Sequence, residues 1–151
     1  MSKNFRNIML IVPIFIVLTA VGVVFINHCA QASKIRDYKT SRYSLTAVEV
    51  LNNHFAFRDK KDIELFRLTL APEFDTIRFD NENFNEVVKI EKADNDEVTK
   101  DYTDGIKAVK VESFNVCFKS NSNDSTYTLR YILCKEQEDS PWLIYAWGFD
   151  G

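Results

Sequence analysis

The segment Trp142–Phe149 has apolar side chains in both of its alternating rows, and this feature constrains the fold more than any other. In an extended strand, successive side chains point to opposite faces of the sheet. The first row is Trp142, Ile144, Ala146 and Gly148, and the second row is Leu143, Tyr145, Trp147 and Phe149. A strand with two apolar faces needs cover on both sides. We therefore expect the chain itself to cover the first row, and either a second core layer or another molecule to cover the second.

Three further segments have the pattern of antiparallel strands. The segment Tyr127–Lys135 alternates strictly and is joined to the last strand by a turn at residues 137–141, and a turn at Asn121–Asp124 precedes it. A strand is also expected at Glu86–Lys92, and a longer one at Ile106–Lys119. In the longer strand the apolar positions change phase at Glu112-Ser113, which predicts a β-bulge there and hence a bent sheet.

Two helices are predicted before the strands. Thr46 and Glu49 form a capping-box pattern, and apolar residues then recur at helical spacing, so we expect a helix from Thr46 to about Arg58. A second helix is expected from Asp62 to Leu70, where Pro72 stops it. The predicted fold class is α+β, with the helical hairpin packed in the concave side of a strongly bent, cone-like antiparallel sheet.

The N-terminus contains nineteen residues without a charge, from Ile8 to Ile26. As a helix this run would be about 28 Å long, close to the hydrocarbon thickness of a bilayer. We therefore expect residues 1–32 to form a signal anchor with a transmembrane helix over residues 8–26. Residues 33–43 would be a juxtamembrane linker, and residues 44–151 the folded domain. Cleavage after Ala32 is the alternative, because Ala30-Gln31-Ala32 has the small-x-small pattern of a signal-peptidase site.

Two signals in the sequence favour opposite orientations of this anchor in the membrane. Four cations follow the apolar run and outnumber Lys3 and Arg6 before it, which favours a cytoplasmic domain. Long domains are translocated largely regardless of flanking charge, however, and the short N-terminal tail is typical of an export signal. We expect a single-pass protein of the cell membrane with its domain outside the cytoplasm, or a secreted protein if the signal is cleaved.

Charge and cysteine content exclude several classes of protein. All 22 acidic residues follow Ala32, so the domain is mildly acidic, and without a basic stripe it is not expected to bind nucleic acid. The strand register predicts Cys117 opposite Thr128 and Cys134 opposite Val111, which separates the two thiols by roughly 20 Å. We expect isolated thiols and no disulfide framework.

The order of these elements supports a family resemblance. The chain runs from Ala47-Val48-Glu49-Val50-Leu51 through Phe55 and the turn 58–63 to Ala71-Pro72-Glu73-Phe74, and closes on the segment 142–148. This layout resembles the nuclear-transport-factor-2-like, cystatin-like superfamily, and most closely exported, membrane-tethered domains of unknown function from Gram-positive bacteria. The resemblance implies a cone-shaped sheet around its helices, frequent dimerisation through the sheet, and in many members an internal cavity.

Catalytic members of that superfamily place Asp, His and Tyr side chains inside the cone. The corresponding candidates for a ligand cavity are His54, Tyr127 and Tyr131. No second titratable group is placed to tune His54, so we expect a partly exposed structural histidine. The acidic loop Asp94–Gly105 has Thr99 where a calcium-binding loop needs glycine. The sequence therefore predicts no catalytic residue, no metal site and no cofactor.

Three functions follow from these features. The favoured one is a membrane-tethered, extracytoplasmic, non-catalytic binding module that associates with a second copy or an envelope protein through the second row of its last strand. The first alternative is a small-molecule binder or enzyme that uses a cone cavity. The second alternative is a structural subunit of a cell-envelope complex of the secretion type.

Overall fold

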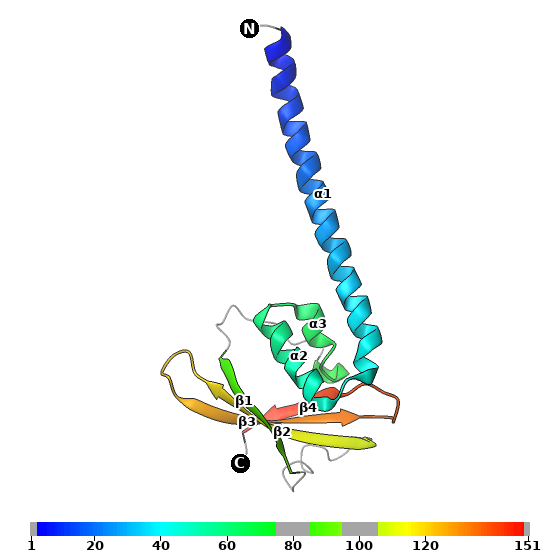
Figure 1. Ribbon diagram of the computed structural model, residues 1–151, viewed down its shortest axis with the longest axis vertical. Coiled ribbons are helices and arrows are strands. Elements are labelled where there is room, and N and C mark those ends of the chain that lie inside the picture. The colour runs from blue at the N-terminus through cyan, green and yellow to red at the C-terminus, as the bar shows by residue number, and fades with distance from the viewer. Residues whose placement is uncertain (1–2, 75–84, 95–105, 150–151) are drawn as a thin grey trace. The chain divides into compact units, whose positions relative to one another are not determined.

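The computed structural model describes residues 3–74, 85–94 and 106–149, with side chains described from residue 21 onward except at Gly22. It is an α+β protein with a four-stranded antiparallel sheet (Figure 1). The elements are α1 (Lys3–Ser41), η1 (Arg42–Ser44), α2 (Ala47–Asp59), α3 (Ile63–Arg67), η2 (Pro72–Phe74), β1 (Glu86–Ala93), β2 (Lys110–Lys119), β3 (Thr126–Lys135) and β4 (Leu143–Gly148). The chain divides into two compact units, residues 1–37 and 38–151.

Helix α1 continues through the residues expected to form a linker. Its last turn belongs to the second unit, because the Tyr38 ring is buried edge-on against Phe57 with ring centroids 5.0 Å apart. Just beyond, Arg42 donates from Nη1 to the carbonyl of Leu68 at 3.1 Å. The folded unit therefore begins at Tyr38 rather than at residue 44. Among the residues whose side chains the structure describes, which begin at residue 21, no helix combines the length and the apolar character needed to cross a membrane.

Helix α2 begins and ends as its sequence dictates. The Thr46 side chain accepts from the Glu49 amide while the Glu49 carboxylate accepts from the Thr46 amide, which confirms the predicted capping box. At the other end the Lys61 amide donates to the Arg58 carbonyl and the Asp62 amide to the Phe57 carbonyl, both at 2.9 Å. These two bonds form a Schellman motif, which requires the left-handed conformation seen at Lys61, with φ of 55°.

Helix α3 is shorter than expected because the residues after it pair with the sheet. It starts at the Asp62 cap, as predicted, but ends at Arg67 rather than Leu70. The Ile144 amide donates to the Thr69 carbonyl and the Ala71 amide donates to the Ile144 carbonyl, each at 2.9 Å. This short parallel bridge covers the edge of β4 and leaves the backbone extended just before Pro72.

The sheet is a meander in the order β1-β2-β3-β4. The β2–β3 register places Val111 opposite Cys134 and Cys117 opposite Thr128, as predicted, and all three cysteines are free. That register is continuous, so the bulge predicted at Glu112-Ser113 is wrong. The irregularities lie instead in β1 between Val87 and Lys89, and opposite Ile132 and Leu133 in β4.

Two apolar clusters, one on each face of the sheet, explain why β2 changes phase without a bulge. The inner cluster joins the helices to the sheet, and its buried members from the sheet and the residue just before β4 are Phe114, Val116, Phe118, Tyr131, Leu133, Trp142 and Ile144. The outer cluster contains Ala71, Ile132, Cys134 and Tyr145, with Phe74, Ile106, Ala108, Val111, Leu143 and Ala146 packed against it. Val111 therefore faces the outer cluster, whereas Phe114 faces the inner one. In Figure 1, α2 and α3 lie over the inner face.

Two segments discussed from the sequence fall largely outside the described residues. The strip between Pro72 and Asn85 was expected to be a short strand or an irregular cover, and only Pro72–Phe74 and Asn85 are described. The acidic loop lies outside them from residue 95 to residue 105.

Candidate functional site

The interior beneath α2 is filled by aromatic side chains around His54. Its ring lies 4.3 Å from Phe66 and 6.1 Å from Tyr131, measured between centroids. His54 is 4% exposed, so the expectation of a partly exposed histidine is wrong: α3 covers it through Phe66. Burial, and secondarily the Arg58 guanidinium, lower its pKa to about 3. His54 is thus neutral at physiological pH and is held by Thr69, whose hydroxyl oxygen lies 2.8 Å from Nδ1.

The two candidate tyrosines lie on the inner face, as their alternation predicted. Tyr131 is buried and stacks on Trp147 at 6.1 Å, and burial raises its pKa. Tyr127 stacks on Phe118, and its hydroxyl accepts from the Asn85 side-chain amide at 2.7 Å. Tyr131 therefore packs close to His54, whereas Tyr127 lies nearer the edge of the sheet. Their surroundings are those of packed core residues.

The predicted row of four side chains on β4 does not exist as one surface. Residue pairing moves from Leu133↔Ile144 to Ile132↔Ala146, which leaves Tyr145 as an extra residue in β4. Because of this bulge, Tyr145 packs in the outer cluster while Trp147 turns to the inner face, 4.9 Å from Phe74. The expectation of a shared face for Leu143, Tyr145, Trp147 and Phe149 is therefore wrong. Phe149 alone among them is strongly exposed, at 67%.

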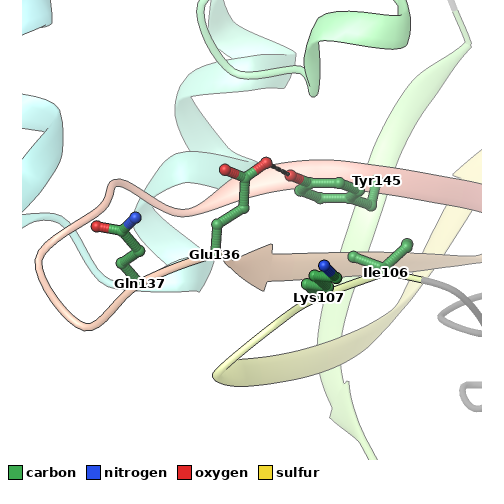
Figure 2. A pocket seen from close by; sticks show the side chains of 5 residues that line it. All are labelled: Ile106, Lys107, Glu136, Gln137 and Tyr145. Carbon is green, nitrogen blue, oxygen red and sulfur yellow. Dashed lines mark hydrogen bonds between the residues drawn. The ribbon is translucent and has the colours of Figure 1, made fainter.

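The outer face carries a pocket of about 500 Å³ at the end of the sheet where β3 and β4 are connected. Figure 2 shows its lining residues: Ile106, Lys107, Glu136, Gln137 and Tyr145. Tyr145 comes from the bulge of β4, and Glu136 and Gln137 follow directly after β3. Ile106 and Lys107 come from the segment before β2, which still pairs with β3 through the Val109 amide and the Lys135 carbonyl at 2.8 Å. We call this site the outer pocket.

Tyr145 orients the carboxylate of the outer pocket. Its hydroxyl donates a hydrogen bond to Oε1 of Glu136, while its ring is buried in the outer cluster (Figure 2). Burial, and secondarily this bond and the Glu136 charge, raise the pKa of Tyr145. The neighbouring thiol, Cys134, has its pKa raised to about 11 by burial and by the charge of Glu73. Both groups remain protonated at neutral pH, so neither is an activated nucleophile.

The charged groups of the outer pocket are not paired with each other. Lys107 forms no ion pair with any described residue, and only Oε1 of Glu136 has a side-chain partner. Just outside the pocket the charges are paired: Lys110 Nζ lies 2.6 Å from Glu138 Oε2, and Lys135 Nζ donates to the Glu138 carbonyl at 3.2 Å. The pocket thus presents an ammonium group and a carboxylate oxygen to solvent, beside an aromatic wall.

Sequence reasoning named Tyr145 but missed the outer pocket, because Glu136 and Gln137 follow β3 outside any periodic segment, and Ile106 and Lys107 were assigned to a strand that in fact begins at Lys110. The β2–β3 register predicted from the sequence nevertheless indicated that Lys107 and Glu136 lie close together. Extending the pairing of Val111 with Cys134 beyond the strand brings Lys107 toward Glu138 and hence close to Glu136. Among the residues described, no cluster of His, Cys, Asp or Glu side chains is suited to hold a metal ion.

Comparison with known proteins gives a family but no characterised relative. A family model described as "Domain of unknown function (DUF4829)" matches residues 48–148. This range runs from the first turn of α2 to the end of β4, and so includes every buried residue of the inner cluster except Ala47 and all five lining residues of the outer pocket. No curated protein and no solved structure matches the chain.

Proposed function

The chain belongs to the family described as Domain of unknown function (DUF4829), and we propose that it is a membrane-tethered, extracytoplasmic module that binds a ligand without catalysis. The outer pocket carries this proposal. It is concave, and it combines apolar surface with charged groups that no described neighbour neutralises; polar groups of this kind fix the orientation of a ligand in small-molecule sites. The residues of the domain interior, in contrast, pack against one another.

The tether rests on the N-terminal apolar run. Residues 8–26 are uncharged in the sequence, and the backbone is helical from Lys3 to Ser41. At the end of this run Val21, Val23, Val24, Phe25 and Ile26 are each more than half exposed. Consecutive exposed apolar side chains are costly in water, and a bilayer would cover them. An extracytoplasmic domain is compatible with the cations that follow the run, because long domains are translocated largely regardless of flanking charge.

The absence of catalysis in this proposal rests on protonation states. Tyr145 and Cys134 have raised pKa values, and His54 is enclosed by aromatic rings without contact with the outer pocket. General acid–base catalysis needs a group that titrates near the working pH and reaches the substrate. Glu136, oriented by Tyr145, is placed to hold a ligand.

The proposed fold family is the nuclear-transport-factor-2-like, cystatin-like superfamily. Its support is a helical hairpin followed by an antiparallel meander, with the helices on one face of the sheet. Association of two copies through the sheet is a second candidate function, favoured by the exposed Phe149 beside Tyr127, with ring centroids 6.0 Å apart. The covered edge of β4 at Ile144 limits where a second strand would pair.

One cysteine tests the tether. Cys29 is exposed and follows the apolar run by three residues, whereas Cys117 is half-buried and Cys134 is buried. In intact cells, a membrane-impermeant maleimide is expected to label the full-length chain, and Cys29→Ser is expected to abolish most of the label. Labelling only after the membrane is permeabilised, or a mature chain that begins at Ser33, would overturn the proposal.

Binding is tested by a panel of small molecules of different charge classes, with thermal unfolding of the full chain in mild detergent as the readout. A true ligand is expected to raise the unfolding temperature of the wild type but not of Lys107→Ala/Glu136→Gln. The matched control is Lys110→Ala/Glu138→Gln, which removes the ion pair just outside the pocket. If no class acts through the pocket, the binding function is wrong.

A further inference from the structure

We propose that the outer pocket binds a small zwitterion with an amino group at one end and a carboxylate at the other, such as a short peptide with free termini. This inference rests on the proposed function, since it names the class of ligand that the same pocket takes. Three features of the pocket carry it: a carboxylate that is oriented by Tyr145, the ammonium group of Lys107, which has no ion-pair partner among the described residues, and a volume of about 500 Å³.

The carboxylate is fixed before a ligand arrives. The hydrogen bond from the Tyr145 hydroxyl engages Oε1 of Glu136, and the Tyr145 ring is itself buried in the outer cluster together with Ile132 and Cys134. Oε2 of Glu136 is without a partner among the described side chains and can accept from an incoming ammonium group. A carboxylate held in this way loses less side-chain freedom on binding than a free surface glutamate does.

The ammonium group of Lys107 supplies the opposite charge. Lys107 lies in the segment before β2 and Glu136 directly after β3, so the two side chains line the pocket from different segments of the chain (Figure 2). Lys107 forms no ion pair with a described residue, although the nearby Lys110 and Lys135 are both engaged by Glu138. Glu138 therefore satisfies the surplus cations outside the pocket and leaves Lys107 for an anionic group.

The space between these charges suits a molecule larger than a single ion. The pocket is within the range of small-molecule sites, which is roughly 300–1,000 Å³. Ile106 and the Tyr145 ring provide apolar surface for the body of the ligand, and the Gln137 side-chain amide lines the same pocket. An inorganic anion would use Lys107 alone, and an apolar molecule would leave both charges desolvated without a partner. A zwitterion satisfies both charges at once.

The experiment titrates alanyl-alanine into the full-length protein in mild detergent by isothermal calorimetry. Two capped probes, N-acetyl-alanyl-alanine and alanyl-alanine amide, each lack one of the terminal charges. We expect the uncapped dipeptide to bind at least tenfold more tightly than either capped form. Glu136→Gln should abolish the preference over the acetylated probe, and Lys107→Ala the preference over the amide. Tyr145→Phe, which removes the orienting hydroxyl, should weaken binding several-fold.

The controls separate this inference from the proposed function. Lys119→Ala and Asp124→Asn remove an ion pair at the opposite end of β2 and should alter dipeptide affinity by less than twofold. Equal binding of all three probes, or no binding of the dipeptide while another class binds through the pocket, overturns the zwitterion proposal alone. If neither the three dipeptide probes nor any class in the small-molecule panel binds through the pocket, both the zwitterion proposal and the proposed binding function are overturned.

Discussion

Acidification should weaken the fold through His54. The Thr69 hydroxyl donates to the Phe66 carbonyl at 2.6 Å, so toward His54 it acts as an acceptor. Nδ1 of His54 therefore carries the proton and donates to Thr69 across 2.8 Å. Protonation of Nε2 would place a positive charge among Phe55, Phe66 and the nearby Arg58 guanidinium. Burial disfavours that charge, and so does the like charge of Arg58.

The size of the effect follows from the two pKa values. In the folded chain the pKa of His54 is lowered to about 3, whereas in the unfolded chain it takes its ordinary value of about 6.5. Between these values the unfolded state binds the extra proton, so stability is full above pH 6.5 and falls as the pH drops. The slope is about 1.4 kcal/mol per pH unit, or about 2 kcal/mol lost at pH 5. That is a large share of a typical stability of roughly 5–15 kcal/mol.

Urea unfolding between pH 5 and 7.5, followed by tryptophan fluorescence, measures this dependence. Both tryptophans, Trp142 and Trp147, belong to the unit that contains His54. We expect the wild type to lose about 2 kcal/mol across this range, and His54→Leu to lose much less. His28 is the only other histidine and is exposed, so His28→Gln should behave as the wild type. An unchanged pH slope in His54→Leu would refute the reasoning.

Two further perturbations test the turn after α2 and the exposed end of β4. Lys61 has a φ of 55°, a conformation that glycine adopts without strain, so Lys61→Gly should raise the free energy of unfolding by about 1 kcal/mol in urea denaturation. The neighbouring Lys60 has a φ of −83°, so Lys60→Gly should not raise it. Phe149 is 67% exposed, so if two copies associate through it, Phe149→Ser should convert the dimer to a monomer in light scattering. The same molar mass for the wild type and for Phe149→Ser would exclude that contact.

Local signals in the sequence predicted most of the fold. The capping box at Thr46, the Asp62 cap, the turn before β3 and the β2–β3 register are all set by neighbouring residues or by one strand pair. The end of α3 was not predictable in this way. Its last residues pair with Ile144, some seventy positions later, and a tertiary hydrogen bond overrides the helical pattern up to Pro72.

The outer pocket depends on the β-bulge at Tyr145, which the alternation of side chains in the sequence does not predict. If β4 were regular, Tyr145 and Trp147 would share a face, and the sequence gives no reason to place an extra residue between them. A bulge at Tyr145 resolves the conflict of a strand that is apolar on both sides, because it sends Tyr145 to the outer cluster and Trp147 to the inner one. The same bulge aims the Tyr145 hydroxyl at Glu136. Bulges commonly redirect a side chain in this way beside functional sites. The two-sided apolar character of β4 thus serves the two cores of one protomer, and the outer pocket lies beside the outer of these cores.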